Sequence, residues 1–308
     1  MNILITGATG FIGKYLTKRL SELNAHRLFC LVRNPKKAEK IKPFGVKLIY
    51  TDIAKKESLA KILNYNIDFI FHCAGYVSNK NQELLHKVNV IGTENICELA
   101  LKLKVKRLIY LSSVAVVSGN PQVPLVEELP FSATNKYGES KIEAEKKVKE
   151  YRKKGLASVI VRPCMVYGKD EPHMLSFLLF LLRYRLLPII GTGENRLHLV
   201  YIKNLVDFMI FSLEGDEFLN ESFFIADKEA LTIKEVFNSF CEGLNAKTPL
   251  NIPNFLKPII FNLPYLGKKL KFLIKDRIYS IDKIGALGFS LPYPAKESLI
   301  ESAKNFEF

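Results

Sequence analysis

Short apolar runs alternate with amphipathic segments through the first half of the chain. Six apolar runs predict strands at residues 2–6, 27–32, 47–50, 69–72, 107–111 and 158–161. Amphipathic segments predict helices near residues 11–23, 35–43, 57–63, 81–102 and 135–153. Because the strands are apolar throughout and alternate with helices, the pattern predicts a parallel sheet that is covered on both faces. Right-handed crossovers then give a doubly wound α/β fold.

After residue 163 the pattern becomes irregular, with more prolines and shorter elements. We expect a smaller, interleaved C-terminal lobe made of residues 164–197 and 227–308. The larger lobe would comprise residues 1–163 and a returning segment near 198–226. In such a fold the active site is expected where the carboxyl ends of the strands face the second lobe.

The composition narrows the class of partner. A chain of 308 residues with 48% hydrophobic and 25% charged residues is typical of globular proteins. Lys and Arg outnumber Asp and Glu by 45 to 31, and the resulting net charge of +14 favours anionic partners. The basic residues are spread along the chain and form no nucleic-acid-binding motif, so we expect no nucleic-acid partner.

Cysteine and histidine spacing gives no reason to expect disulfides or a metal site. The five cysteines contain no C-x-x-C pair, and the five histidines contain no i, i+4 pair. We find no signal peptide at the N-terminus and no apolar run near the roughly 20 residues that span a membrane. We therefore expect a cytoplasmic protein with reduced thiols and no bound metal.

A glycine-rich turn, TGATGFIG (6–13), follows the first predicted strand. The spacing G-x-x-G-x-x-G allows a tight turn, and the amides that open the next helix can then bind a pyrophosphate. The turn therefore predicts a dinucleotide site. We expect the site to include Gly7, Thr9, Gly10, Phe11, Ile12 and Gly13.

The end of the second predicted strand favours one dinucleotide over the other. NAD-binding proteins carry Asp or Glu there for the ribose hydroxyls, whereas this chain has Arg33 followed by Asn-Pro-Lys-Lys. A guanidinium can pair with a 2′-phosphate, so NADP(H) is favoured over NAD(H). Asp52 and Ile53, after the third strand, suit a contact with the adenine, although an Asp that opens a turn explains Asp52 equally well.

Tyr137 and Lys141 lie four residues apart in a predicted helix that Thr134 or Asn135 can cap. A lysine ammonium on the same helix face would favour the phenolate and lower the pKa of the tyrosine from about 10 towards neutrality. Such a tyrosine can serve as general acid and base for an alcohol–carbonyl pair.

A serine pair, Ser112 and Ser113, ends the fifth predicted strand on the same edge of the sheet as the glycine turn. A hydroxyl at this place can hydrogen-bond a substrate oxygen. A serine pair that only satisfies backbone groups at the strand end is the alternative interpretation.

Together these motifs resemble the short-chain dehydrogenase/reductase superfamily in its extended, epimerase/dehydratase-like branch, nearer to the dihydroflavonol-reductase and 3β-hydroxysteroid-dehydrogenase members. Further matching segments are HCAG (72–75), NVIGTENI (89–96), YLSSVAVV (110–117), YGESK (137–141), RPCMVYG (162–168), GTGENRLHLVYIKNLVD (191–207) and DKIGALGF (282–289). Their order and spacing extend the resemblance over essentially the whole chain.

The resemblance implies a role for each matching residue. Tyr137 would be the catalytic acid and base, Lys141 would hold the nicotinamide ribose, and Ser113 would position the substrate oxygen. Further residues lining the cofactor would be Cys73, Ala74, Gly75, Pro163 and Val166. Asn89 would have a more structural role, and the resemblance also implies a homodimer formed through the helices near 81–102 and 135–153.

The chain departs in three ways from the nucleotide-sugar enzymes of this superfamily. Dehydratases carry Asp-Glu where Val114 and Ala115 follow Ser113, and an Asn is typical where Met165 stands. The Arg of their G-x-G-x-x-x-R run falls on Leu197, and a one-residue shift in a strand reverses the face to which a side chain points. A substrate diphosphate would therefore lose two anchors.

The second lobe is instead rich in apolar residues, at 174–182 and 255–273. Core packing explains any single one of them, but as a set they favour a hydrophobic small-molecule substrate. Basic residues flank both runs: Arg183, Arg185, Lys268, Lys269, Lys271 and Lys275. A basic rim around apolar surface is also compatible with peripheral contact to an anionic membrane.

The sequence thus predicts an NADP(H)-dependent oxidoreductase that interconverts a carbonyl and an alcohol on a hydrophobic small molecule. A nucleotide-sugar epimerase is the alternative enzyme. A non-catalytic NADP(H)-binding sensor or assembly protein is the alternative from another class, and the complete Ser–Tyr–Lys set argues against it.

Overall fold

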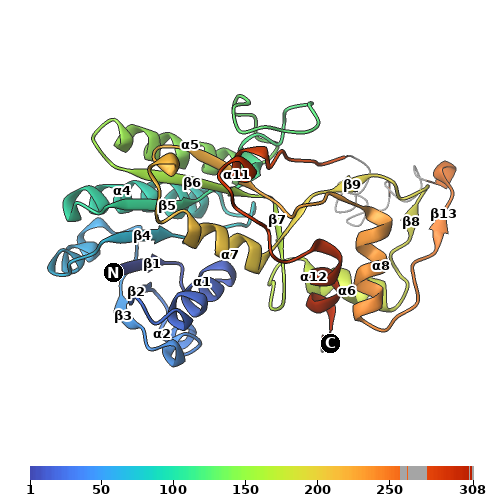
Figure 1. Ribbon diagram of the computed structural model, residues 1–308, viewed down its shortest axis with the longest axis horizontal. Coiled ribbons are helices and arrows are strands. Elements are labelled where there is room, and N and C mark those ends of the chain that lie inside the picture. Colours follow the sequence, from blue (N-terminus) through green and yellow to red (C-terminus); the bar gives the residue numbers. More distant parts are fainter. Residues whose placement is uncertain (257–261, 263–275, 305, 307–308) are drawn as a thin grey trace.

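A seven-stranded parallel sheet, in the order β11-β6-β5-β4-β1-β2-β3, forms the centre of the computed structural model (Figure 1). The structure describes residues 1–256, 262, 276–304 and 306. The strands are β1 (Asn2–Thr6), β2 (Arg27–Val32), β3 (Lys47–Tyr50), β4 (Phe69–His72), β5 (Arg107–Leu111), β6 (Ser158–Pro163) and β11 (Ser222–Ile225). The six predicted strands and the doubly wound α/β class are confirmed, with β6 two residues longer than predicted.

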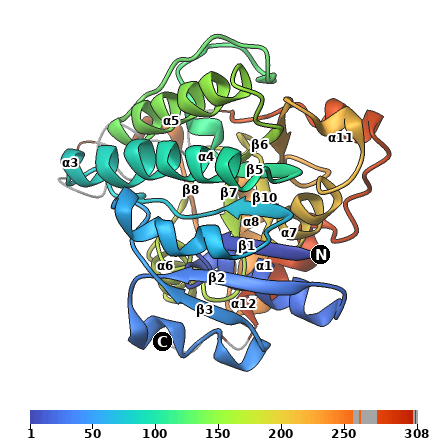
Figure 2. The same ribbon diagram turned by 90° about the vertical axis from the view of Figure 1, so that its left-hand side faces the viewer.

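Each face of the sheet buries its own apolar layer, because successive strand residues point to opposite faces. In β1, Ile3 and Ile5 belong to one layer and Leu4 to the other. Helices α4 (Gly92–Leu103) and α5 (Lys136–Arg152) cover the layer that contains Leu4 (Figure 2). Helices α1 (Phe11–Glu22) and α7 (Ile202–Phe211) cover the opposite layer.

Three predicted helices are less regular than expected. The segment near 35–43 forms only α2 (Pro35–Ala38) and the 3₁₀ turn η1 (Lys42–Phe44), since Pro43 cannot continue a hydrogen-bonded helix. The segment near 57–63 is the 3₁₀ helix η2 (Lys56–Asn64). The long segment from 81 consists of α3 (Gln82–Leu85), a π-helical stretch η3 (His86–Ile91) and then α4.

The second lobe lies beside the carboxyl ends of the sheet strands and is built from short elements (Figure 1). Its two-stranded sheets pair β7 (Met165–Tyr167) with β10 (Leu199–Tyr201), β9 (Arg196–Leu197) with β12 (Leu231–Thr232), and β8 (Ile189–Ile190) with β13 (Asn251–Ile252). Its helices are α6 (Leu175–Arg183), α8 (Ile233–Gly243) and α12 (Ala295–Ala303), whereas α11 (Asp282–Ala286) packs against β11 of the central sheet (Figure 1). Short 3₁₀ turns complete the chain: η4 (Val114–Val116), η5 (Asp216–Phe218) and η6 (Asn254–Leu256).

Helix α8 is the centre of this lobe and packs against both α6 and α12. Among the described residues, no helix is both long and apolar enough to cross a membrane. The apolar run at 255–273 lies outside the described residues except for Phe255, Leu256 and Asn262, and so do Lys268, Lys269, Lys271 and Lys275.

Candidate active site

A cavity of about 820 Å³ lies where the sheet meets the second lobe. Its lining includes residues of the glycine turn after β1, residues after β4 and β5, and residues from α6 and α8. Strand β1 pairs with β2 on one side and β4 on the other, so the cavity is at the point where the strand order reverses. This is the place at which open α/β sheets bind their ligands.

The glycine turn brings three backbone segments close together. Gly7 has φ of +71°, and a Cβ placed on it would lie 2.6 Å from the amide nitrogen of Ala74. A Cβ on Gly13, in the first turn of α1, would collide with the carbonyl oxygen of Gly7. Gly10 precedes α1, and the first turn of that helix has no side-chain cap and no acidic residue. The amides that open α1 are therefore available to an anionic group.

The predicted cofactor residues divide into two groups. Those that line the cavity are Gly7, Gly10, Phe11, Ile12, Gly13, Cys73, Gly75, Pro163 and Val166, together with Tyr137 and Lys141. The others, outside the described lining, are Thr9, Ala74, Arg33, Asp52 and Ile53. The Asp52 carboxylate accepts the amide of Ala54 at 3.0 Å, as in the turn interpretation, and Ile53 is buried.

A basic residue that we did not predict, Lys37, lines the cavity beyond the end of β2. Asn34 places it there, because the Asn34 side chain accepts the amides of Lys36 and Lys37 and so starts the short helix α2. Arg33 is exposed at the end of the same strand. Two cations thus stand where the sequence predicted one.

Ser113, Tyr137 and Lys141 all line the cavity, although they come from β5 and α5. Ser113 follows β5, and its hydroxyl accepts the amide of Ala115 at 3.2 Å. Asn135, and not Thr134, caps α5 by accepting the amide of Gly138 at 2.9 Å. The Nζ of Lys141 donates to the carbonyl oxygen of Leu111 at 2.7 Å, so the lysine is fixed against the end of β5.

The expected effect of Lys141 on the tyrosine is wrong for this structure. Burial raises the pKa of Tyr137 to about 12, and a hydrogen bond with Ser113 offsets only part of this rise. The Lys141 ammonium is held by Leu111 and lies 4.6 Å from the centre of the Tyr110 ring. Burial also lowers the pKa of Lys141 to about 8, although the Glu145 carboxylate opposes this shift. At neutral pH Tyr137 therefore carries its proton.

Asparagine side chains that lie far away in the sequence hold the start of α5. Asn79 accepts the amide of Tyr137 at 2.8 Å. Asn89, in the π-helical stretch η3, donates to the Ser140 hydroxyl at 2.9 Å, and Ser140 donates to the Tyr137 carbonyl oxygen. The resemblance implied a structural role for Asn89, whereas nothing in the sequence pattern around Asn79 indicated its partner.

A buried ion pair between Arg162 and Glu145 holds the elements that carry the site residues. Arg162 donates to both carboxylate oxygens of Glu145, at 2.9 and 2.7 Å, and both side chains are almost completely buried. The Ser112 hydroxyl donates to Glu145 at 2.6 Å. Because Glu145 follows Lys141 by one helical turn, one carboxylate connects the serine pair, the lysine helix and β6.

The part of the cavity contributed by the second lobe is mainly apolar. Leu197 lines it, whereas Arg196 is exposed and donates to the carbonyl oxygen of Ala230, which confirms the predicted reversal of faces. Met165 lines it at the place of the typical Asn. The remaining apolar residues on this side are Met174, Leu175, Leu178, Leu199, Val236, Phe237 and Phe240. The α8 residues among them were not predicted, although their i, i+3/i+4 spacing was visible.

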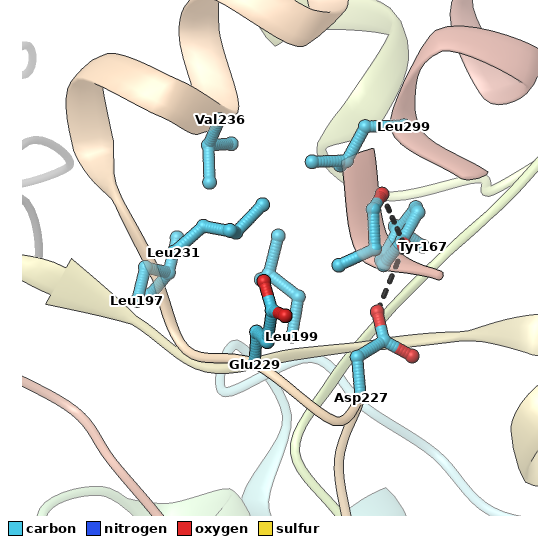
Figure 3. Close-up of a pocket in the computed structure, with 9 residues that line it drawn as sticks. Tyr167, Leu197, Leu199, Asp227, Glu229, Leu231, Val236 and Leu299 are labelled. Atoms are coloured by element: carbon cyan, nitrogen blue, oxygen red, sulfur yellow. Dashed lines mark hydrogen bonds between the residues drawn. The ribbon is translucent and has the colours of Figure 1, made fainter. Parts of the chain in front are cut away.

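A buried carboxylate lies next to the apolar wall (Figure 3). Asp227 accepts hydrogen bonds from the Tyr167 hydroxyl at 2.8 Å, the Tyr201 amide at 2.9 Å and the Asn204 side chain at 2.8 Å. Burial raises the pKa of Asp227 to about 6, because these three donors only partly offset the loss of hydration. Asp227 thereby fixes β7 and β10, on which Met165 and Leu199 stand.

Comparisons with known proteins agree with this geometry. A family model described as NAD dependent epimerase/dehydratase family matches residues 3–226. The chain is 26% identical to the 4-hydroxy-2-methyl-3-oxo-4-farnesyl-3,4-dihydroquinoline-1-oxide ketoreductase of Stigmatella aurantiaca, over 82% of this chain and 76% of that protein. It is 29% identical to the UDP-glucose 4-epimerase of Vibrio cholerae, over 80% of this chain and 77% of that protein.

The fold is likewise that of a solved epimerase. The structure of UDP-glucuronic acid 4-epimerase from Bacillus cereus in complex with NAD superimposes with a TM-score of 0.79 at 22% identity, over 98% of this chain and 97% of that one. The chain belongs to the NAD-dependent epimerase/dehydratase family, in the extended branch of the short-chain dehydrogenase/reductases. It is an enzyme of the class that contains NAD(P)-dependent oxidoreductases and epimerases.

Proposed function

We propose that the protein is an NADP(H)-dependent oxidoreductase that interconverts a carbonyl and an alcohol on a hydrophobic small molecule. One observation carries the proposal: Ser113, Tyr137 and Lys141 line the same cavity as the glycine turn, and the second lobe closes that cavity with apolar side chains. The backbone around Gly7 and Gly13, where a Cβ would collide, fits a pyrophosphate at the start of α1. A bound nicotinamide dinucleotide would supply or accept the hydride.

In the reducing direction the chain has to deliver one proton and hold one oxygen. With its pKa raised to about 12, Tyr137 is protonated at neutral pH and can donate to the oxygen of a carbonyl as negative charge develops there. Ser113 interacts with the Tyr137 hydroxyl, so it is placed to hydrogen-bond the same substrate oxygen. Lys141 adds a positive charge to the cavity below a pH of about 8.

The cations after β2 support a preference for NADP(H). Between Leu23 and Ala38 the chain has no Asp or Glu, while Arg33 is exposed and Lys37 lines the cavity. A 2′-phosphate carries charge that the ribose of NAD lacks, and hydrogen bonds to charged groups contribute more than neutral ones. We assign the two cations to that phosphate.

The catalytic part of the proposal is tested with Tyr137→Phe. The purified protein is first titrated with NADPH and NADH and is then assayed against carbonyl compounds ordered by hydrophobicity. Loss of the tyrosine proton should lower kcat/KM by about 10²- to 10⁴-fold and leave NADPH affinity within a few-fold. Tyr50→Phe, an exposed tyrosine outside the cavity, is the control. Retained activity in Tyr137→Phe would reject the assignment.

The cofactor preference is tested with the double variant Arg33→Ser/Lys37→Ser. We expect NADPH affinity to fall roughly 10- to 100-fold, as removal of two charged contacts predicts, with NADH affinity within about twofold. Lys36→Ser changes a neighbouring cation that lies outside the described lining and should alter neither affinity. Equal losses for both dinucleotides would show that these cations do not distinguish them.

The same assays separate the alternative functions. An epimerase would invert a sugar nucleotide with no net consumption of NADPH. The identity with a UDP-glucose 4-epimerase keeps this candidate, but Leu197 and Met165 remove two polar contacts from the cavity wall. A non-catalytic sensor would bind NADPH, and substitution of Tyr137 or Lys141 would not change its function.

A further inference from the structure

A group of large apolar side chains is exposed on the second lobe. Phe177, Phe180 and Tyr184 recur at i, i+3 and i+7 on one face of α6, and Phe177 is 44% exposed. Leu186, three residues past the end of the helix, is 58% exposed. We call these four residues and the neighbouring exposed Leu250 and Phe255, at 58% and 76%, the α6 surface.

Two hydrogen bonds join the segments that carry this surface. Arg185 donates from Nε to the carbonyl oxygen of Thr248 at 3.1 Å. The amide of Ile189 donates to the carbonyl oxygen of Leu250 at 2.9 Å. The second bond belongs to the pairing of β8 with β13. Both strands lie at the end of the molecule that is remote from the central sheet (Figure 1). The exposed residues are therefore one local surface and are not scattered over the molecule.

The segments that carry this surface contain basic and no acidic residues, and Glu171, Glu194 and Glu242 border them. Residues 172–193 and 243–256 contain Arg183, Arg185 and Lys247 and no Asp or Glu. Apolar side chains surrounded by cations are typical of protein surfaces that lie in the headgroup region of an anionic bilayer. A two-fold contact with a second copy of the chain would instead place cations of this surface near cations of the partner, which costs free energy.

We propose that the α6 surface docks on an anionic phospholipid bilayer. The apolar residues would enter the boundary between headgroups and acyl chains, and the three cations would pair with lipid phosphates. Helix α6 presents Leu175 and Leu178 to the cavity on another face. Docking therefore places α6, one wall of the cavity, next to the bilayer, in which apolar molecules dissolve. The docking itself does not depend on the proposed reaction.

The test measures binding of the full chain to vesicles by co-flotation, without dinucleotide or substrate. We expect binding to vesicles that contain phosphatidylglycerol and at least tenfold weaker binding to pure phosphatidylcholine. Leu186→Ser/Leu250→Ser should weaken binding to the anionic vesicles roughly 10- to 100-fold, since both leucines would leave the lipid. Arg185→Gln should weaken it about fivefold, and added salt should reduce that difference.

Leu23→Ser/Leu63→Ser is the matched control, because both leucines are exposed, at 42% and 44%, and lie on the larger lobe. It should bind vesicles like the wild type, and all variants should keep wild-type NADPH affinity and melting temperature. The proposal is overturned if the wild type fails to float with anionic vesicles, if both vesicle types bind equally, or if the two leucine pairs behave alike. A change of oligomeric state in Leu186→Ser/Leu250→Ser without a change in vesicle binding would assign the surface to a second copy.

Discussion

The two lobes contribute to the cavity in different ways. In the larger lobe the wall near the glycine turn is backbone: Gly7 touches the chain at Ala74, and Gly13 touches Gly7. In the second lobe the wall is made of side chains such as Met165, Leu197 and Phe237, carried on short strands and on α8. One part of the cavity is therefore fixed by main-chain geometry, and the other part is set residue by residue.

This difference separates what the site shares with its family from what is particular to this chain. A backbone wall tolerates no added atom, so it accepts one ligand shape. A wall of apolar side chains changes its volume and polarity with each substitution, while the fold below it stays the same. We expect substitutions in the larger lobe to affect stability or cofactor binding, and those in the second lobe to change substrate selection.

The largest effect should come from Glu145→Gln, in the larger lobe. The substitution leaves the buried Arg162 without its charged partner and replaces one of the two oxygens that accept from Arg162 and Ser112 by an NH₂ group, which is itself a donor. The free energy of unfolding should fall by about 3–5 kcal/mol, measured by urea titration. Glu150→Gln, which breaks an exposed pair with Lys154 on the same helix, should leave the midpoint close to that of the wild type. Similar losses in both variants would refute the assigned role of the buried pair.

Gly13→Ala should have the next largest effect, on cofactor affinity. The new Cβ collides with the Gly7 carbonyl, so either the turn or α1 has to shift. We expect NADPH affinity to fall roughly 10- to 100-fold in a fluorescence titration, the range that overpacking of one methyl group predicts. Gly285→Ala, in α11, has no heavy atom within 4 Å of the added methyl and should bind as the wild type does. Normal affinity in Gly13→Ala would mean that the backbone wall can move.

Met165→Asn examines the wall of the second lobe. It replaces a cavity-lining thioether by the amide that is typical of nucleotide-sugar enzymes. For hydrophobic carbonyls kcat/KM should fall about tenfold through KM, because part of the apolar contact is lost, while NADPH affinity stays constant. An equal loss for small, polar carbonyls would show that Met165 acts on the reaction itself and not on substrate choice.

The smallest effect should be a pH dependence due to Asp227. Its folded-state pKa of about 6 lies above the usual 3.8, so the folded protein takes up a proton between pH 7 and 5 that the unfolded chain does not. This group should therefore add about 1 kcal/mol of stability as the pH falls through that window. Asp227→Asn should lose this gain in urea titrations at pH 7 and 5. Asp170→Asn, at a carboxylate whose pKa Lys14 lowers, should leave the gain unchanged.

Features that depend on neighbouring residues in the sequence could be predicted, whereas features that depend on residues far apart in the sequence could not. The strands of the larger lobe follow from local apolar periodicity, and the exposure of Arg196 beside the buried Leu197 follows from strand alternation. The pKa of Tyr137 does not follow, because burial in the folded chain raises it and the Lys141 ammonium is held by the Leu111 carbonyl oxygen. Asn79 and Tyr137 are 58 residues apart, so their contact needs the folded chain.

Cofactor residues show the same limit on a smaller scale. The glycine turn is a local motif and lies where it was predicted. Beyond β2, however, Asn34 redirects the chain into a short helix, and this helix brings Lys37 and not Arg33 to the described cavity lining. A side chain that accepts two amides decides which of two neighbouring cations faces the cavity.

The support of the catalytic helix α5 depends on the number of residues in the π-helical stretch before α4 as well as on their identity. The hydrogen bonds of a π turn span one residue more than those of an α turn, and the buried Asn89 lies inside this stretch. Deletion of Val88 would return the stretch to α spacing and rotate everything before it by about 100° around the axis of α4. Tyr76 lies before the deletion and would move relative to Asn89, so Asn89 could then no longer hold both Tyr76 and Ser140. Chains that differ here by a single-residue deletion would thus differ in the support of the catalytic helix, even with every side chain of the cavity retained.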